Sequence, residues 1–207
     1  EGKYTTQPVH QAYIEPHACI VSVAADGQST IWCSSQGQFM VRAFTAKVMG
    51  VDMSSIRVTP AESGGGFGGK TTIYLEPVAV RLSEKSGRPV KIVMSREEVL
   101  RATGPAPASK ARVRIAATND GELTAIEGWL GYAVGCTNDM AGFIGAMSVA
   151  SYKFPNLKLE ATASLTNTPK SAAYRAPSAP QAAFAIESVI DEIAQQLDMD
   201  PIELRLK

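Results

Sequence analysis

Several stretches of this chain alternate apolar with polar residues, which is the period-two pattern of a strand with one buried face. Two pairs of such stretches flank an Asp-Gly turn signal and predict hairpins, one joining 19–23 to 29–33 and the other joining 112–117 to 123–132. Shorter strands are predicted at 56–60, 90–94 and 157–165. The segment 133–151 is rich in Gly, Ala and Met, has no clear period, and predicts irregular structure with room for a short helix.

Other stretches repeat apolar residues at helical spacing. A helix is predicted at 38–49, with Gly50 just beyond its end, from the spacing of Met40, Val41, Phe44 and Val48. The most regular helical pattern begins at Pro180. Further helices are predicted from Pro77, Ser95 and Asp200. This mixture of hairpins, strands and helices predicts an α+β fold with mixed sheets and packed helices, rather than a purely parallel sheet.

The composition narrows the function classes. The 207 residues are 45% hydrophobic and 19% charged, and 20 basic residues balance 20 acidic ones. A net charge of zero argues against a dedicated nucleic-acid or anionic-membrane surface, and no apolar run is long enough to span a bilayer. We therefore expect no nucleic acid and no membrane as partners. Both ends of the sequence lie in what look like structured segments, so we expect a fragment of a longer protein.

The cysteines and histidines give no clear site. Cys19, Cys33 and Cys136 show no C-x-x-C spacing, which indicates neither a disulfide framework nor an iron–sulfur cluster. A Cys19–Cys33 bridge could form if the two flanking strands pair, and the sequence leaves this open. Reduced thiols favour a cytoplasmic location. His10 and His17 lie on either side of Glu15, but a metal site would need further ligands, so ordinary half-buried histidines are the preferred interpretation.

The glycine-rich stretch 63–71 is the strongest candidate for binding chemistry. Five of its nine residues are glycine, which leaves backbone N–H groups open to a ligand. The stretch lies between a predicted strand and a predicted helix, an arrangement that presents N–H donors and a helix N-terminus to an anion. It fits both the P-loop pattern, with Lys70 and Thr71, and the dinucleotide pattern, so the motif alone does not choose a ligand. A tight turn without any ligand is the structural alternative.

A second loop at 173–181 carries Arg175 and leads into the helix that begins at Pro180. Two such loops in one chain favour a shared anionic ligand over a ligand bound by either loop alone.

Several segments resemble the molybdenum hydroxylases, the family of xanthine dehydrogenase and aldehyde oxidoreductase, and they occur in the family order. These segments are 13–16, 34–36, 64–70, 86–90, 152–156 and 174–181. The resemblance covers nearly the whole chain. It implies that residues 1–207 form one molybdopterin-binding domain, with one or two α/β subdomains, from the first half of the cofactor-binding region of a large subunit.

The resemblance also implies roles for individual residues. Gln36 would lie beside the molybdenum, and no side chain of this chain would ligate the metal directly. The backbone of Gly66, Phe67 and Gly68 would approach the metal and the pterin. Arg175 and Ala176 would hold the cofactor from the second loop. N–H donors, an amide and an arginine suit an anionic cofactor of this kind.

The implied reaction is hydroxylation of a substrate carbon with water. Electrons would leave through iron–sulfur clusters and FAD on partner subunits or domains. The general base is expected in the C-terminal half of the large subunit, another implied partner, so the chain alone would be inactive. The cofactor form, mononucleotide or dinucleotide, stays open, and self-association into a homo-oligomer is compatible with the sequence.

Three positions depart from particular branches of the family. Purine-oxidising members carry a glutamate where Thr71 stands and a phenylalanine where Pro177 stands. Carbon monoxide dehydrogenases carry a cysteine where Ala176 stands. The small-molecule substrate that fits better is therefore an aldehyde or another N-heteroaromatic compound.

Two alternatives come from other function classes. In a P-loop-like nucleotide-binding protein, Lys70 would contact phosphate and Thr71 would bind magnesium, but the sequence offers no apolar strand ending in the required Asp. In a non-catalytic assembly module, the segment 133–151 would pack against another domain.

Overall fold

The computed structural model describes residues 1–137 and 145–207. These residues form two compact units. The first, called the loop unit below, contains residues 10–105 and 172–175. The second, called the sheet unit, contains 1–9, the described part of 106–171, and 176–207.

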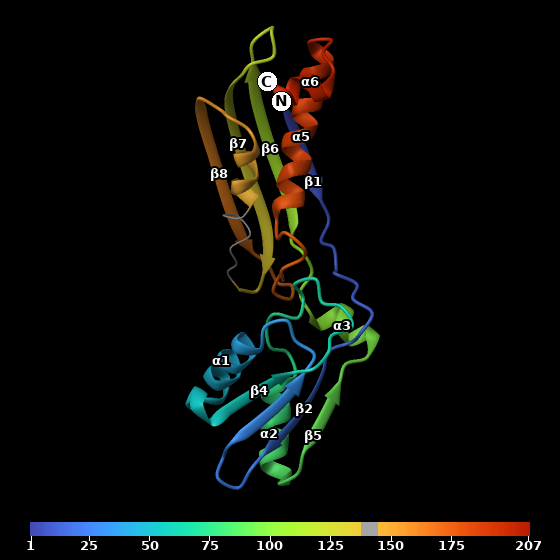
Figure 1. Ribbon diagram of the computed structural model, residues 1–207, viewed down its shortest axis with the longest axis vertical. Coiled ribbons are helices and arrows are strands. Elements are labelled where there is room, and N and C mark those ends of the chain that lie inside the picture. Colours follow the sequence, from blue (N-terminus) through green and yellow to red (C-terminus); the bar gives the residue numbers. More distant parts are fainter. Residues whose placement is uncertain (138–144) are drawn as a thin grey trace. The chain divides into compact units, whose positions relative to one another are not determined.

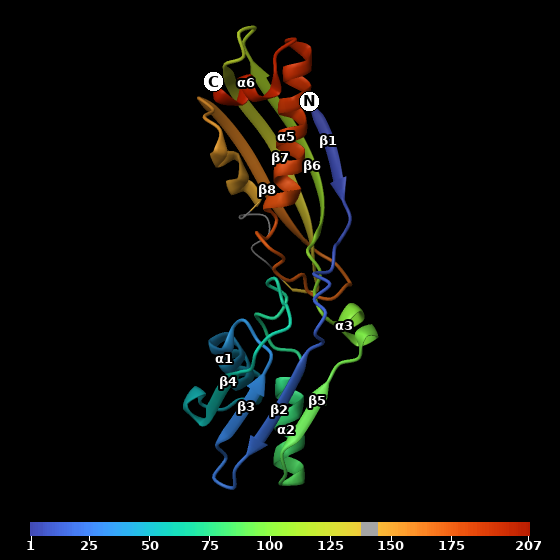
Figure 2. The same ribbon diagram turned by 45° about the vertical axis from the view of Figure 1, so that its right-hand side comes forward.

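The loop unit is built on a four-stranded sheet in the order β4-β3-β2-β5 (Figure 1 and, with β3 labelled, Figure 2). β2 and β3 form the antiparallel hairpin that the sequence predicts, and β3 and β4 run parallel, with α1 between them in the chain. The elements are β2 (Ala18–Val23), β3 (Ser29–Cys33), α1 (Gln38–Met49), the short 3-10 helix η1 (Met53–Ser55), β4 (Ile56–Pro60), α2 (Glu76–Ser86), β5 (Val90–Val93) and α3 (Arg96–Ala102).

One face of this sheet forms the core of the loop unit. Alternate residues of β2 and β3, among them Val21 and Ile31, are fully buried with residues of α1 and α2. Cys19 and Cys33 face each other across the hairpin as buried, free thiols. Burial raises the pKa of both thiols to about 12. The bridge that the sequence left open is therefore not formed, and both residues pack as small apolar side chains.

Helix α1 buries a different face from the one marked by its regular apolar spacing. Of the four residues whose spacing predicted this helix, only Val41 is buried. The buried stripe instead consists of Val41, Thr45, Ala46 and Met49. Met40 and Val48 are 47% and 63% exposed. The helix ends as predicted, with Gly50 in the left-handed conformation.

The sheet unit contains a second four-stranded sheet, in the order β1-β6-β7-β8 (Figure 2). β6 and β7 form the second predicted hairpin, and β8 runs parallel to β7. The elements are β1 (Gly2–Thr6), β6 (Ala108–Ala117), β7 (Leu123–Gly135), the short 3-10 helix η2 (Met147–Ser151), β8 (Asn156–Leu165), α5 (Ala179–Gln196) and α6 (Pro201–Leu206).

Two features of the sheet unit differ from the sequence prediction. β1 was not predicted, and it is held by antiparallel pairing with β6. The start of the segment 133–151 is not irregular, because β7 continues to Gly135. η2 supplies the short helix in that segment, and residues 138–144 lie outside the described residues.

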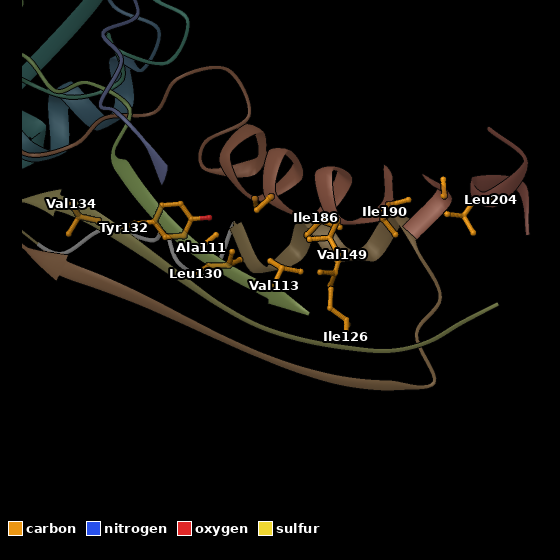
Figure 3. Close-up of a cluster of buried hydrophobic side chains, with 14 residues drawn as sticks. Ala111, Val113, Ile126, Leu130, Tyr132, Val134, Val149, Ile186, Ile190 and Leu204 are labelled. Carbon is orange, nitrogen blue, oxygen red and sulfur yellow. The ribbon is translucent and has the colours of Figure 1, made fainter. Parts of the chain in front are cut away.

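Helix α5 covers one face of this sheet. Val113, Ile126 and Leu130 lie on the covered face, and the apolar stripe of α5, including Ile186 and Ile190, packs on them (Figure 3). The predicted α+β class, with mixed sheets, hairpins and packed helices, is confirmed. In the described ranges, no helix has both the length and the apolar character needed to cross a bilayer.

The exposure pattern of α1 gives a direct test. Val41→Ala should lower the free energy of unfolding by about 2 kcal/mol, because it removes two buried methyl groups and leaves a small cavity. Val48→Ala, the matched exposed control on the same helix, should change it by less than about 0.5 kcal/mol. Urea titration of both variants measures the two changes, and equal losses would contradict the burial of Val41 and the exposure of Val48.

Candidate functional site

The glycine loop, residues 64–71, packs closely on neighbouring segments of the loop unit. A Cβ atom on Gly68 would lie 2.7 Å from the carbonyl oxygen of Ala173, and one on Gly66 would collide with Oε1 of Gln36. Gly68 also has a φ of 101°, a conformation that other residues rarely adopt. Contact with the Ala173 backbone and the positive φ therefore require glycine at position 68, whether or not a ligand binds, whereas a side chain at position 66 would displace the amide of Gln36.

The second loop is joined to the glycine loop through the backbone. The N–H of Arg175 donates to the carbonyl oxygen of Phe67 over 2.9 Å. Nε2 of Gln11 donates to the carbonyl oxygens of Ala173, at 2.8 Å, and Gly104, at 3.1 Å. Two loops that are far apart in the sequence therefore form one continuous surface of the loop unit.

Gln36 lies between β3 and α1 and has an exposed side chain. Its Oε1 accepts hydrogen bonds from the N–H groups of Gly68, at 2.9 Å, and Lys70, at 3.4 Å. Because two donors fix the oxygen of the amide, the Nε2 group is left to donate elsewhere. The described residues provide no acceptor for it. A fixed and exposed amide donor suits an electronegative ligand atom next to the glycine loop.

The backbone is strained at the same place. In the described part of the chain six residues other than glycine have positive φ, and three of them belong to the predicted site: Phe67 at 52°, Arg175 at 30° and Ala176 at 60°. Each such residue costs roughly 1–3 kcal/mol and persists only where its surroundings impose it. Concentrated strain of this kind is typical of ligand-binding loops.

Several donors on the two loops lack a protein partner. Among the described residues, no acceptor is found for the N–H groups of Gly65, Gly66 and Phe67, or for the guanidinium of Arg175. Gly65 and Phe67 have left-handed backbone conformations. Successive N–H groups in such turns form a concave donor set that binds anions. The residues present therefore fit the anionic pterin cofactor that the resemblance implies.

The structure brings together five of the six residues predicted for the site. Gln36, Gly66, Phe67, Gly68 and Arg175 all lie in the loop unit and contact one another through the bonds and close approaches described above. The sixth, Ala176, is the first residue of the following segment of the sheet unit, and its carbonyl oxygen accepts the N–H of Ala179 at the start of α5.

Lys70 does not face a ligand. Its Nζ donates to Oε2 of Glu15 over 2.7 Å and to Oγ of Ser34 over 3.0 Å, and it lies 5.1 Å from the ring centroid of Tyr13. Lys70 is 1% exposed. A P-loop lysine must reach the phosphates, and this one is fully engaged beneath the loop. Thr71 donates its hydroxyl to the carbonyl oxygen of Gly68 at 3.0 Å. The P-loop alternative is therefore wrong.

Glu15 connects the two ends of the glycine loop. The same Oε2 that pairs with Lys70 also accepts the N–H of Gly64 at 2.8 Å. Burial opposes ionisation of Glu15, but the hydrogen bonds from Lys70 and Gly64 outweigh it and lower the pKa of the carboxyl. The charged carboxylate thereby holds the loop closed through two contacts to one oxygen, and the N–H of Glu15 adds a third contact by donating to the carbonyl oxygen of Gly64 at 3.2 Å.

The helix after the loop does not present its N-terminus to an anion, contrary to the prediction. α2 begins only at Glu76, with Pro77 in its first turn. The buried carboxylate of Glu76 accepts the N–H groups of Tyr74, at 2.9 Å, and Leu75, at 3.1 Å. The negative charge of this side chain therefore lies at the start of α2 and pairs with the two backbone donors that precede the helix.

His10 and His17 belong to a hydrogen-bond network and not to a metal site. Nε2 of His17 lies 2.7 Å from the hydroxyl of Tyr13, which donates to Oγ1 of Thr103 at 3.2 Å, and Nε2 of His10 lies 2.8 Å from the same Oγ1. No set of three potential metal ligands occurs in the described residues. Burial, together with the charge of Lys70, lowers the pKa of His17 to about 4, so this ring is neutral at neutral pH.

Sequence reasoning missed the residues that support the site. Gln11 and Glu15 fix the two loops, yet neither was predicted to have a role. The one available signal was Lys70, because a lysine beside glycines and an apolar segment needs a carboxylate partner once it is buried. Nothing in the linear sequence identifies Glu15 as that partner.

Comparison with known proteins gives a consistent result. The family described as "Molybdopterin cofactor-binding domain" matches residues 1–207. The chain is 31% identical to a xanthine dehydrogenase of Emericella nidulans, over 94% of the chain and 15% of that protein. It is 30% identical to the nicotinate dehydrogenase large molybdopterin subunit of Eubacterium barkeri, over 100% of the chain and 49% of that subunit.

Solved structures agree with the sequence comparison. The aldehyde oxidoreductase of Desulfovibrio gigas superposes with a TM-score of 0.92 and 27% identity, over 99% of this chain and 23% of that one. The chain thus spans less than half of the length of each of these three relatives.

Gly68→Ala tests the contact between the two loops. The new Cβ would meet the carbonyl oxygen of Ala173, so we expect the Arg175 N–H to lose its protection from hydrogen exchange and the loop unit to lose about 2–4 kcal/mol of stability. Gly27→Ala is the matched control. Gly27 also has positive φ, at 85°, but a Cβ there meets nothing within 4 Å. Equal effects of the two substitutions would show that backbone strain alone, and not contact between the loops, requires glycine at position 68.

The buried His17 predicts a pH dependence. Its pKa is about 4 in the folded protein and near the ordinary histidine value of 6.5 in the unfolded chain, so the unfolded chain binds the proton first as the pH falls. The contribution of His17 to the free energy of unfolding should therefore be fully present above pH 6.5. As the pH falls towards 4, the free energy of unfolding should decrease by up to about 1.4 kcal/mol per pH unit. His17→Gln should flatten this slope between pH 6.5 and 5, whereas His10→Gln should leave the His17 contribution in place. Urea titrations across that range measure it, and an unchanged slope in His17→Gln would exclude His17 as its source.

Proposed function

This chain belongs to the family of molybdopterin cofactor-binding domains of the molybdenum hydroxylases, and on that premise we propose that its two joined loops hold the pterin-linked molybdenum of such an enzyme. The observation that carries the proposal is the hydrogen bond between the Arg175 N–H and the Phe67 carbonyl. It joins the loop of Arg175 to the loop of Gly65, Gly66 and Phe67, whose N–H groups, like the Arg175 guanidinium and the Gln36 Nε2, have no acceptor among the described residues.

Each residue has a distinct part in this proposal. Gln36 would donate from Nε2 to an electronegative atom of the bound cofactor, because its Oε1 is already held by Gly68 and Lys70. The N–H groups of Gly66 and Phe67 bind the anionic side of the pterin. Arg175 supplies the positive charge, which a planar guanidinium can direct at a phosphate or a thiolate. Ala176, which follows it, contributes backbone only.

When bound, this cofactor supplies a two-electron oxidation that couples water to a substrate carbon. The substrate loses a hydrogen and gains a hydroxyl group from water, and two electrons and two protons are released. The electrons would pass to iron–sulfur and FAD groups on partner subunits or domains, and the base that accepts a proton would lie outside this chain. The C-terminal half of a large subunit would complete the pocket.

We propose an aldehyde or an N-heteroaromatic compound as the substrate. The named relatives include proteins that act on xanthine, nicotinate and aldehydes. By the resemblance, a purine requires an acid at position 71, and here Thr71 uses its hydroxyl to bond the Gly68 carbonyl. Carbon monoxide chemistry requires a thiol at position 176, where this chain has Ala176. The buried, reduced Cys19 and Cys33 support a cytoplasmic location for the enzyme.

The test uses the protein that carries this chain, purified with its partners from a host that makes the cofactor. We expect Arg175→Gln to lower both molybdenum per polypeptide and the fluorescent pterin released by acid oxidation several-fold, with little change in melting temperature. Arg57→Gln, at an exposed arginine of the same unit, is the matched control and should retain both. Absence of molybdenum and pterin from the unsubstituted protein would overturn the proposal.

The substitution Gln36→Glu distinguishes a role of Gln36 in supporting the glycine loop from a role in the reaction. The substitution keeps an oxygen for the Gly68 N–H but replaces the free amide donor with a negative oxygen. We expect the cofactor content to be largely retained and kcat to fall about a hundredfold, the usual cost of losing one preorganised donor. An unchanged kcat would mean that Gln36 supports the loop and takes no part in the reaction.

A further inference from the structure

His10 begins a short segment that contacts both loops of the candidate site. Two side chains of this segment, Gln11 and Tyr13, are buried. The amide of Gln11 bonds a carbonyl oxygen of the second loop. A Cβ atom on Gly69 of the glycine loop would lie 2.8 Å from Cε1 of Tyr13 and 3.0 Å from Cδ of Gln11. Residues 10–13, called the support segment below, therefore fix the position of both loops.

The support segment is strained at its centre. Ala12, between the two supporting side chains, has a φ of 53°, in the left-handed region that residues with a side chain seldom occupy. Such a conformation persists only where its surroundings impose it. The N–H group of Ala12 donates to Nδ1 of His10 over 3.0 Å. The imidazole therefore helps to impose the conformation on which the directions of Gln11 and Tyr13 depend.

The hydrogen bonds assign the protonation state of His10. The hydroxyl proton of Thr103 is committed to the carbonyl oxygen of Val99 at 2.6 Å. Nε2 of His10 lies 2.8 Å from the same Oγ1, so this nitrogen must carry a proton and donate it. Nδ1 accepts the N–H of Ala12 and must be without a proton. The structure therefore holds His10 as a neutral ring with its hydrogen on Nε2.

We infer that neutral His10 is an acid-sensitive positioning residue of the cofactor site, which keeps Gln11 and Tyr13 in contact with the two loops. The inference rests on the proposed function. A proton added to Nδ1 would face the N–H of Ala12, so the bond between the two groups would be lost. The strained residue would then relax, and the side chains on either side of it would no longer be directed at the glycine loop and the second loop.

The groups around His10 favour the neutral ring. Burial, followed by the positive charge of Arg96 on α3, lowers the pKa of His10 against a smaller opposing effect of the Val99 carbonyl. The other titratable groups that face it are Tyr13, with ring centroids 5.3 Å apart, and His17. A released segment would titrate near the ordinary value of 6.5, so the support is complete above that pH and is lost as the pH falls.

Two substitutions separate the bonds of this side chain. In His10→Asn, the side-chain oxygen can accept the N–H of Ala12, as in an Asx-turn, and it does not titrate. In His10→Gln, the amide can still donate to Thr103, but it lies one carbon beyond the position of Nδ1. The first variant should therefore preserve the support segment and the second should release it.

The test uses the protein that carries this chain, purified with its partners and incubated above and below pH 6.5. We expect His10→Gln to lose molybdenum and fluorescent pterin about fivefold faster above that pH, the effect of one missing hydrogen bond. The unsubstituted protein should approach this rate as the pH falls. His10→Asn should keep the slow rate with a flatter pH profile. Because His17 is present in all three proteins, the difference between profiles reports His10.

Hydrogen exchange of residues 64–71, measured on protein freed of cofactor, provides a second readout. The exchange should be faster in His10→Gln and return to the original rate in His10→Asn. Equal rates in all three proteins, or equal acceleration in both variants, would overturn the inference, because neither result depends on the bond to Ala12. An unsubstituted protein without molybdenum or pterin would instead overturn the proposed function, and the role of His10 towards the cofactor with it.

Discussion

The candidate site depends on one close approach between two backbone segments. The carbonyl oxygen of Ala173 lies where a side chain on Gly68 would have to be, and the adjacent Phe67 carbonyl accepts the Arg175 N–H. Everything else at the site follows from keeping these segments in contact. The strained φ angles of Phe67 and Arg175 are tolerated because the contact imposes them, and the free donors share one surface because it aligns them.

Beneath this surface, an ion pair between the buried Lys70 and the half-buried Glu15 supports the glycine loop. Lys70 is enclosed by Glu15, Ser34 and the ring of Tyr13. Burying such a charge is costly unless it is paired and hydrogen-bonded, and Glu15 meets that need while also bonding the Gly64 N–H. The lysine that completes a P-loop pattern in the sequence thus stabilises the loop from below, and the donors above it are backbone and Arg175.

The elements of the fold were largely predictable because their signals are local. Asp-Gly turns predicted both hairpins, and Gly50 predicted the end of α1. Strand β1 was missed because its five residues have no apolar core of their own and depend on pairing with the distant β6. The buried face of α1 was also not readable from apolar spacing, since Thr45 is buried and Val48 is not. Tertiary contacts decide such cases.

The residues of the candidate site divide in the same way, into those that the sequence indicates and those that only tertiary contacts reveal. Gln36, Phe67 and Arg175 were predicted from the resemblance to the molybdenum hydroxylases, which rests on the glycine loop, the loop arginine and shorter segments in the family order. Gln11 could not be predicted, since its function consists of two hydrogen bonds to carbonyl oxygens that belong to distant loops, Gly104 and Ala173. Groups that touch a ligand need particular chemistry and so leave a pattern, whereas groups that hold a loop need only reach a backbone atom. The supporting shell of a site built from loops is therefore determined by the fold, and it is read from the structure.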